Sequence, residues 1–434
     1  MASEPQQLPA VHEAWLPREH ALHRPRHGGR QMTALVCALM FFVTPTLLWI
    51  VGVRPTEIEN HKLASFPSLG DGWKFFTGLP GWATDQLSFR SGAISAADGI
   101  SRGLFGEGAP LDQAPPPVAG PIPGATPSTP KNAPSPQGSP NSQAGYRRVV
   151  QGVDGWLYYG YDAEAKCAPS RPLADTLSRI NTLRQAVESS GRKFVFVIAP
   201  DKTTMVPQKL PASYPDKDCS QPKQEADWAQ FLAAGALDLR PELKKSEGRV
   251  GRPIYPPNDT HWTDEGALVM ARDVANAVQP GVTQTWVSTP TRMYDVNADL
   301  PPLLGRNEVK TLQEYTLKPD GAVDRGGLSN GDIDKPVYRK TSPLVGTIDK
   351  RTLIYGDSFT KASSRYLPGG FTNLTMLAHY TSKTTQEQAI DEFVNAEVVV
   401  VEAVERSVSA GQLTFIEDGF LNAVRAKLEE HPIG

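Results

Sequence analysis

The sequence lacks the features that mark nucleic-acid-binding and metal-rich proteins. Its 434 residues carry 44 Lys and Arg against 47 Asp and Glu, which leaves no excess of positive charge to attract nucleic acid. The three cysteines form no C-x-x-C pair, so no zinc site is predicted. Apolar residues make up 39% of the chain, which excludes global disorder. The composition favours a folded protein of one or two domains, for which we predict neither a metal nor a cofactor.

The segment from Met32 to Val53 lacks any charged residue. At ~1.5 Å per helical residue it is long enough to cross a hydrocarbon core of ~30 Å. The alternatives are a buried core helix and a cleaved signal peptide. A core helix would show polar residues at helical spacing, and a signal peptide would end in small residues at a cleavage site. The segment shows neither, so we predict an uncleaved transmembrane anchor over residues 32–53.

The charges that flank this segment predict its orientation. Only Arg54 and then Lys62 follow it closely, whereas four arginines precede it. Basic residues favour the cytoplasmic side of a membrane, so we expect residues 1–31 to be a cytoplasmic tail. The remainder is then extracytoplasmic, on a single-pass protein of the cell membrane. The four preceding arginines are Arg18, Arg24, Arg26 and Arg30.

Two cysteines fall in the part that this topology exports. Cys167 and Cys219 would lie in an oxidising compartment, where paired cysteines form disulfides, and we predict that they pair. A metal site is the alternative, and it lacks a nearby histidine at zinc spacing. Cys37 lies within the apolar segment and is expected to be an apolar filler there.

Composition divides the exported part into three regions. Residues 54–107 form a mixed stem segment with one expected helix at 94–105. Residues 108–145 are rich in proline and contain no aromatic residue, so they cannot bury a core and are predicted to be a semi-extended linker. A proline-rich ligand for another protein is the alternative. Residues 146–434 are predicted to be the folded catalytic domain.

This domain alternates apolar strands with amphipathic helices, which predicts an α/β fold with a mostly parallel sheet. Chemistry in such folds lies at the carboxyl ends of the strands. A turn at Asp154-Gly155 predicts a hairpin before the first helix. The expected strands are 193–200, 351–355 and 397–404, and the expected helices are 172–192, 225–236, 264–278 and 413–430.

Two short motifs contain candidate catalytic residues. Ser358 lies in Gly-Asp-Ser-Phe directly after a predicted strand, where a sharp turn exposes the hydroxyl and points a backbone N–H at a developing oxyanion. Asp259 and His261 lie in Asp-Thr-His-Trp, and alternate residues of an extended segment face the same way. Asp259 would therefore orient the imidazole of His261. Alone, each motif is equally typical of ordinary loops and helix caps.

Together the motifs supply a nucleophile, a base and an orienting carboxylate. A serine hydroxyl needs such a base to accept its proton. His261 is the best placed histidine, because three others are cytoplasmic on this topology and one is in the stem. We therefore predict a triad of Ser358, His261 and Asp259. The other histidines are His20, His23, His27, His61, His379 and His431.

These residues resemble the SGNH-hydrolase-like family of alginate and exopolysaccharide O-acetyltransferases. DTHW (259–262) and GDSF (356–359) are similar to its catalytic blocks, with Asp-x-His before Ser, the reverse of ordinary SGNH esterases. ENHKLASFPSL, DQLSFR, GVDGWLYY and FVFVIAPDKTTMVPQKLP resemble further family segments. The spacing of the two exported cysteines also looks like a disulfide of relatives. One departure is Asp201, which stands where relatives often carry Asn.

The resemblance implies a three-layer, flavodoxin-like SGNH domain and transfer of acetyl groups to a polysaccharide through an acetyl-serine. It also implies a partner, a membrane-bound O-acyltransferase that supplies the acetyl groups. The alternatives are a polysaccharide acetyl esterase with the same triad and a non-catalytic polysaccharide-binding assembly protein.

Three further residues are candidate substrate contacts. Arg406 would hold a sugar carboxylate or pair with Glu402. Lys202 would contact substrate or be a solvated loop charge. Trp262 would stack on a sugar ring or pack beneath the helix that follows it.

Overall fold

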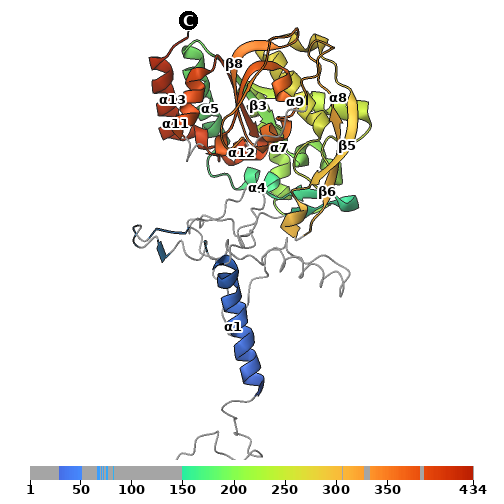
Figure 1. Cartoon of the computed structure of the whole chain (residues 1–434), viewed down its shortest axis with the longest axis vertical. Coiled ribbons are helices and arrows are strands. Elements are labelled where there is room, and N and C mark those ends of the chain that lie inside the picture. The colour runs from blue at the N-terminus through green and yellow to red at the C-terminus, as the bar shows by residue number, and fades with distance from the viewer. Residues whose placement is uncertain are drawn as a thin grey trace, which may run out of the picture. The chain divides into compact units, whose positions relative to one another are not determined.

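The computed structural model describes residues 29–50, 66–68, 70, 72, 75, 76, 82, 149–304, 306–326, 333–381 and 386–433. The chain divides into two compact units, Met1–Ile94 and Ser95–Gly434. Figure 1 shows both units. The predicted linker at 108–145 and the helix expected at 94–105 lie outside the described residues.

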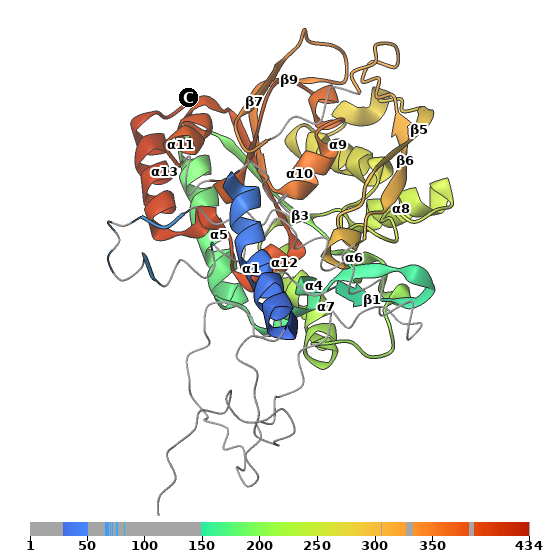
Figure 2. The ribbon, with the colours of Figure 1, turned by 60° about the horizontal axis from the view of Figure 1, so that its bottom comes forward.

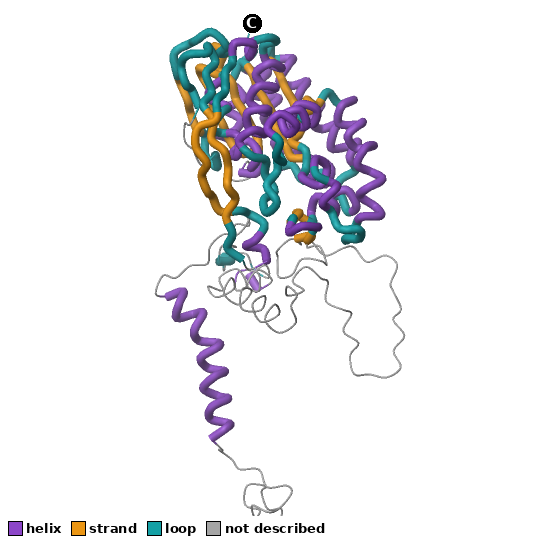
Figure 3. Tube along the Cα trace, turned by 90° about the vertical axis from the view of Figure 1, so that its right-hand side faces the viewer, coloured by secondary structure: helices purple, strands orange, loops and turns teal. Residues whose placement is uncertain are grey.

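The first unit contains helix α1 (Gly29–Ile50), a continuous helix in Figure 3 that overlaps the predicted anchor. Within the described part of the chain, no helix is both long and apolar enough to cross a lipid bilayer. The anchor over residues 32–53 is therefore not confirmed and stays a prediction from the sequence.

The second unit is built on a six-stranded mixed sheet with the order β4-β3-β10-β8-β9-β7. All neighbouring strands are parallel except β7, which is antiparallel to β9 at the edge. The predicted α/β fold with a mostly parallel sheet is confirmed. The strands are β3 (Lys193–Ala199), β4 (Ala236–Asp238), β7 (Val337–Lys340), β8 (Ile348–Gly356), β9 (Phe371–Ala378) and β10 (Val398–Val404).

Helices cover both faces of this sheet and make it the middle of three layers. Residues of β3 alternate between two apolar cores, because successive side chains of a strand point to opposite faces. One face packs against α5, α7, α11 and α13, and the other packs against α8, α9 and α10. Figure 1 shows α5, α11 and α13 on one side of the sheet and α8 and α9 on the other. The helices are α4 (Tyr161–Cys167), α5 (Leu173–Ser189), α6 (Lys202–Met205), α7 (Lys217–Ala233), α8 (Arg240–Val250), α9 (Asp264–Val278), α10 (Ser358–Ser363), α11 (Gln386–Asn395), α12 (Glu405–Ala410) and α13 (Asp418–Glu430).

Two hairpins stand outside the main sheet. The predicted one pairs β1 (Val149–Gln151) with β2 (Leu157–Tyr159), and its turn places Asp154 and Gly155 at positive φ angles of 55° and 78°. Gly155 suits this turn because it has no Cβ to clash in the left-handed region. The second hairpin, β5 (Pro290–Asn297) with β6 (Val309–Tyr315), has no counterpart among the predicted elements.

Most predicted elements agree with the structure. Helix α9 has the predicted bounds, and strands β3 and β10 agree within one residue. Helix α7 begins well before the predicted residue 225, and α13 begins after the predicted residue 413 because a short 3-10 turn, Thr414–Ile416, precedes it. Figure 2 shows α9, which follows the motif at 259–262, next to α10, which begins at Ser358.

Candidate active site

The structure brings the two candidate motifs together. Ser358 is the half-buried first residue of α10, at the carboxyl end of β8. The ring of His261 packs against Phe359, the next residue, with 5.0 Å between ring centres. The motif at 259–262 therefore lies against the start of the helix that begins with Ser358.

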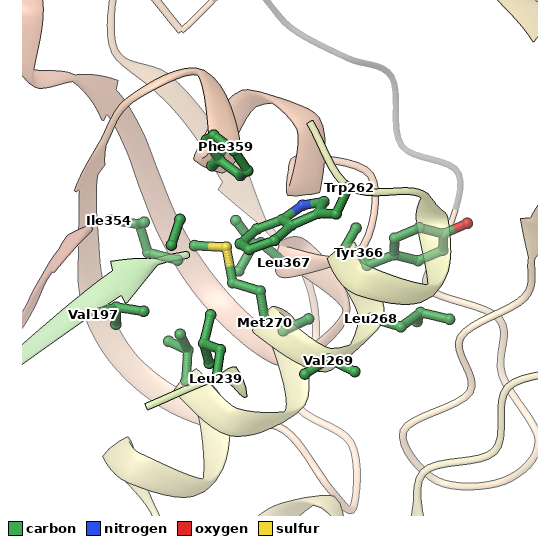
Figure 4. Packing of buried hydrophobic residues seen from close by; sticks show 14 of the residues in the cluster. Val197, Leu239, Trp262, Leu268, Val269, Met270, Ile354, Phe359, Tyr366 and Leu367 are labelled. Atoms are coloured by element: carbon green, nitrogen blue, oxygen red, sulfur yellow. The ribbon is translucent and has the colours of Figure 1, made fainter. Parts of the chain in front are cut away.

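Trp262 holds the motif at 259–262 against α10. Its ring packs against that of Phe359 (Figure 4), with 4.7 Å between the ring centres, and its Nε1 donates to Ser363 Oγ at 3.0 Å. The side chain is buried, at 2% exposure. Trp262 is thus a packing residue, which is the second of its two predicted roles, and its burial gives no support to stacking on a sugar ring.

The predicted contact between Asp259 and His261 is present. Oδ1 of Asp259 accepts the His261 backbone N–H at 2.9 Å and lies 3.1 Å from Nδ1 of the ring. The other ring nitrogen, Nε2, is buried and has no hydrogen-bond partner among the described residues. Nδ1 is therefore held by a carboxylate while Nε2 remains able to accept a proton.

A second carboxylate, which the sequence did not predict, faces the same nitrogen. Oδ2 of Asp299 lies 3.1 Å from His261 Nδ1. Oδ1 accepts the backbone N–H of Thr260 at 2.8 Å, and the Thr260 hydroxyl also donates to this carboxylate. Asp299 follows the hairpin strand β5, in a region with no motif to reveal it.

Lys310 of β6 balances part of this negative charge. Its Nζ lies 2.7 Å from Oδ2 of Asp259, which is buried at 1% exposure. Burial alone would raise the pKa of Asp259, but Lys310 and His261 outweigh burial and hold that pKa well below its usual value. Burial would lower the pKa of His261, whereas the hydrogen bonds and charges of Asp259 and Asp299 raise it to about 9.

Asp259, His261 and Asp299 also offer one atom each within 4.8 Å of one another, a spacing that could hold a cation. The positive charge at this position is already supplied by Lys310, and an N–H on Nδ1 lies between the two carboxylates. The arrangement therefore fits a proton-accepting histidine better than a metal ion, and we assign no metal.

The serine turn is braced by two buried carboxyl groups. Asp357 accepts the backbone N–H of Phe359 at 2.9 Å and that of Val404 at 2.8 Å. Glu402 accepts the Asp357 N–H at 2.9 Å and the Thr360 hydroxyl at 2.8 Å. Burial, followed by the charge of Asp357, raises the pKa of Glu402 well above its usual value. Burial therefore favours the protonated form of Glu402.

Gly356 is required here because of close approach. A Cβ on this residue would lie 1.9 Å from Thr360 Oγ1 and 2.7 Å from Glu402 Oε2. The turn itself does not need a positive φ at this glycine. Gly356 therefore allows the turn to pack closely on α10 and β10.

Lys202 is not the substrate contact or solvated charge that the sequence predicts. It is buried at 1% exposure, and its Nζ donates to four backbone carbonyls at 2.6–3.1 Å. Its side chain therefore ties the first hairpin to the loop that carries Asp259, and its ammonium has no capacity left for substrate. The carbonyls belong to Leu157, Pro256, Pro257 and Asp259.

Arg406 is likewise used within the protein. Its Nη1 lies 2.9 Å from Asp201 Oδ1 and 3.3 Å from Asp162 Oδ1, and its side chain is 10% exposed. The expected pairing with Glu402 is wrong, because Glu402 bonds to the serine turn. The predicted contact with a sugar carboxylate is not supported, because two protein carboxylates already match the charge.

The predicted disulfide is confirmed. Cys167, the last residue of α4, bonds to Cys219 in the first turn of α7, with 5.8 Å between their Cα atoms. The neighbouring Lys166 is buried and forms ion pairs with Glu405 at 3.0 Å and Asp201 at 3.6 Å. The bond therefore closes one side of the buried charge cluster that contains Arg406.

A cavity of about 380 Å³ lies between β6 and the loop 252–258, which precedes Asp259 in the chain. This volume is within the usual range for small-ligand pockets. Lys310 and Asn258 contribute to its wall, whereas neither Ser358 nor His261 does. The cavity is thus adjacent to the Asp259 side of the site and separate from the serine.

The fold and the meeting of the two motifs define an SGNH-type α/β domain, and comparison with known proteins agrees. Residues 149–362 match the family described as "SGNH hydrolase-like domain, acetyltransferase AlgX". The family resemblance predicted from the sequence is confirmed.

Two relatives carry the name "Probable alginate O-acetylase AlgJ". The Pseudomonas syringae pv. tomato protein is 34% identical over 134 residues, which are 30% of this chain and 33% of that protein. The Pseudomonas putida protein is 27% identical over 217 residues, 46% of this chain and 54% of that protein. The matches thus span between a third and about half of these relatives. The solved O-acetyltransferase domain of Pseudomonas putida AlgJ has a TM-score of 0.45 at 19% identity and covers 65% of this chain and 99% of that one.

Proposed function

We propose that this protein is an extracytoplasmic O-acetyltransferase that acts on a polysaccharide through Ser358, His261 and Asp259. The observation that carries the proposal is the position of His261. Its Nδ1 is bound to carboxylate, its Nε2 is unpartnered among the described residues, and its ring lies against the residue after Ser358. A serine nucleophile needs a base whose one ring nitrogen is held by a carboxylate and whose other ring nitrogen can take the proton.

In the first half of the reaction, His261 Nε2 accepts the proton of the Ser358 hydroxyl as Oγ attacks the carbonyl carbon of an acetyl ester. The Phe359 N–H is taken by Asp357, so the N–H of Ser358 itself is the donor proposed for the oxyanion. Cleavage of the ester C–O bond returns the proton from His261 to the leaving alcohol. The product is an acetyl ester on Ser358.

In the second half, His261 accepts the proton of a sugar hydroxyl as that oxygen attacks the acetyl-serine. The bond to Ser358 Oγ breaks, and His261 returns the proton to the serine. Alginate is the proposed acceptor, because the two relatives described above are named as probable alginate O-acetylases. We further propose a membrane-bound O-acyltransferase as acetyl supplier and an anchor at residues 32–53 that holds the enzyme near it.

The disulfide supports the extracytoplasmic location. Disulfides such as Cys167–Cys219 persist in oxidising compartments and are rare in the cytosol. A catalytic domain outside the membrane would also meet an exported polysaccharide directly.

Acetyl transfer can be measured on the full chain with p-nitrophenyl acetate as donor and alginate oligosaccharides as acceptor. We expect acetylated oligosaccharide by mass spectrometry, and we expect Ser358→Ala to abolish it. Ser178→Ala is the control, because Ser178 is exposed on α5. Release of acetate without acetylated sugar would support the esterase instead, and full transfer by Ser358→Ala would exclude the triad.

A further inference from the structure

We propose that Asp299 and Lys310 are positioning residues that complete the Asp259–His261 pair, Asp299 as a second carboxylate on Nδ1 and Lys310 as the cation that offsets Asp259. This inference rests on the proposed function, because it assigns roles in the action of the same base. It extends the triad to a set of two carboxylates, one imidazole and one ammonium.

The first argument is distance. Nδ1 of His261 lies 3.1 Å from Asp259 Oδ1, with which it forms a hydrogen bond, and 3.1 Å from Asp299 Oδ2. A rotation of the ring would move Nδ1 away from both carboxylates. The ring is thus fixed in the orientation that directs Nε2 away from the carboxylates.

The second argument is that Asp299 is itself held in place. Its carboxylate accepts both the N–H and the hydroxyl of Thr260, the residue between the two motif members. Its own backbone N–H donates to Asp259 Oδ2 at 3.1 Å. The two carboxylates are therefore linked to each other as well as to His261, which is more than a chance surface contact would provide.

The third argument is charge balance. Asp259 bonds to Lys310 Nζ at 2.7 Å, so one positive charge already offsets it, whereas Asp299 lies in contact with the imidazole at 3.1 Å. The titratable groups near the ring are thus Asp259 and Asp299, which are in contact with it, and Lys310, which pairs with Asp259. Lys202 donates to the backbone carbonyl of Asp259, and burial lowers its pKa to about 7. Asp299 supplies the negative charge that stabilises an imidazolium, and Lys310 limits that stabilisation.

Both residues come from one element. Asp299 follows β5, and Lys310 lies on β6, so the β5–β6 hairpin delivers the second carboxylate and the ammonium to the same motif. The hairpin, which lies outside the main sheet, therefore supplies two of the groups that surround His261.

The charge balance predicts opposite effects for two substitutions. Asp299→Asn removes a negative charge beside the ring and should lower the pH at which His261 titrates by about 1 unit. Lys310→Met removes the offsetting positive charge and should raise that pH. The double variant should lie between the two single variants. Asp295→Asn is the matched control, because Asp295 is exposed on β5 and bonds to Thr311.

The titration can be followed by NMR on the full chain with ¹³C-labelled histidine, with the His261 signal assigned from its loss in His261→Gln. This readout needs no acetyl donor, so it remains decisive even if no acetyl transfer is found and the proposed function fails. Where transfer occurs, the pH midpoint of kcat/KM should move with the NMR midpoint.

Shifts in opposite directions, with no shift for Asp295→Asn, support the inference. A midpoint for Asp299→Asn equal to that of the control, or a shift of the Lys310→Met midpoint in the same direction as that of Asp299→Asn, would overturn it. If Asp299→Asn does not fold, Lys310→Met decides alone, and an unchanged or lowered midpoint for that variant overturns the inference.

Discussion

His261 lies between two carboxylates, and these neighbours determine the pH at which it can accept a proton. A histidine in solution titrates near ~6.5, whereas Asp259 and Asp299 raise the pKa of His261 to about 9. The base must be neutral to act, so kcat/KM for an acetyl ester should rise with pH and level off only near pH 9. A profile that levels off near pH 6.5 would contradict this account of the site.

The same pKa also links stability to pH. Because the folded state raises the pKa, protonated His261 stabilises the fold fully below about pH 6.5, and this contribution is lost as the pH rises through about 9. Urea denaturation of the wild type and of His261→Gln should therefore differ more at pH 6 than at pH 10. An equal difference at both pH values would show that the folded and unfolded pKa values are alike.

Glu402 is a buried carboxyl group that accepts two hydrogen bonds of the serine turn. Because burial raises its pKa and favours the protonated form, Glu402→Gln, which keeps an oxygen that can accept both hydrogen bonds, should retain near wild-type stability and activity. Glu402→Ala should lose about 2 kcal/mol, because the Asp357 N–H and the Thr360 hydroxyl lose their acceptor. Urea denaturation distinguishes the two variants, and a Gln variant as unstable as the Ala variant would mean that Glu402 is ionised.

At the scale of elements, the disulfide between α4 and α7 closes a loop of 52 residues. Loop-closure entropy for that length corresponds to about 4 kcal/mol of stabilisation, an upper figure because native strain and residual unfolded structure reduce it. The double variant Cys167→Ser/Cys219→Ser should therefore lose several kcal/mol in urea denaturation. Cys37→Ser, at the free cysteine of α1, is the control and should match the wild type. Equal stability of the double variant would remove this role for the disulfide.

Elements with strong local signals can be predicted from the sequence. Helix α9 has a regular apolar stripe after Thr263, and β3 and β10 are continuous apolar runs. Helix α7 begins earlier than its pattern predicts, because its apolar residues start only near Trp228. Its first turns are polar, and the Cys167–Cys219 disulfide attaches them to α4. The β5–β6 hairpin is mostly exposed and has no clean alternation, so its pattern does not reveal strands.

At the scale of the whole molecule, the site can be predicted only where its residues cluster in the sequence. Asp259, His261 and Ser358 lie in compact motifs, whereas Asp299 and Lys310 reach the site through the non-local pairing of β5 with β6. The role of Lys202 escapes prediction because nothing beside it in the sequence shows the four carbonyls, from two separate segments, that surround it. Local patterns thus identify the proposed reacting groups, whereas the residues that position these groups can be found only from the fold.

The proposed reaction depends on one covalent species, an acetyl group on the Ser358 hydroxyl. The most direct measurement is to incubate the full chain with an acetyl ester in the absence of acceptor, quench with acid and map the peptides by mass spectrometry. We predict one added acetyl group on the peptide that contains Ser358, its absence in Ser358→Ala and its loss when oligosaccharide is added. Acetyl transfer to sugar that continues in Ser358→Ala, or a label that lies on another residue, would contradict the account.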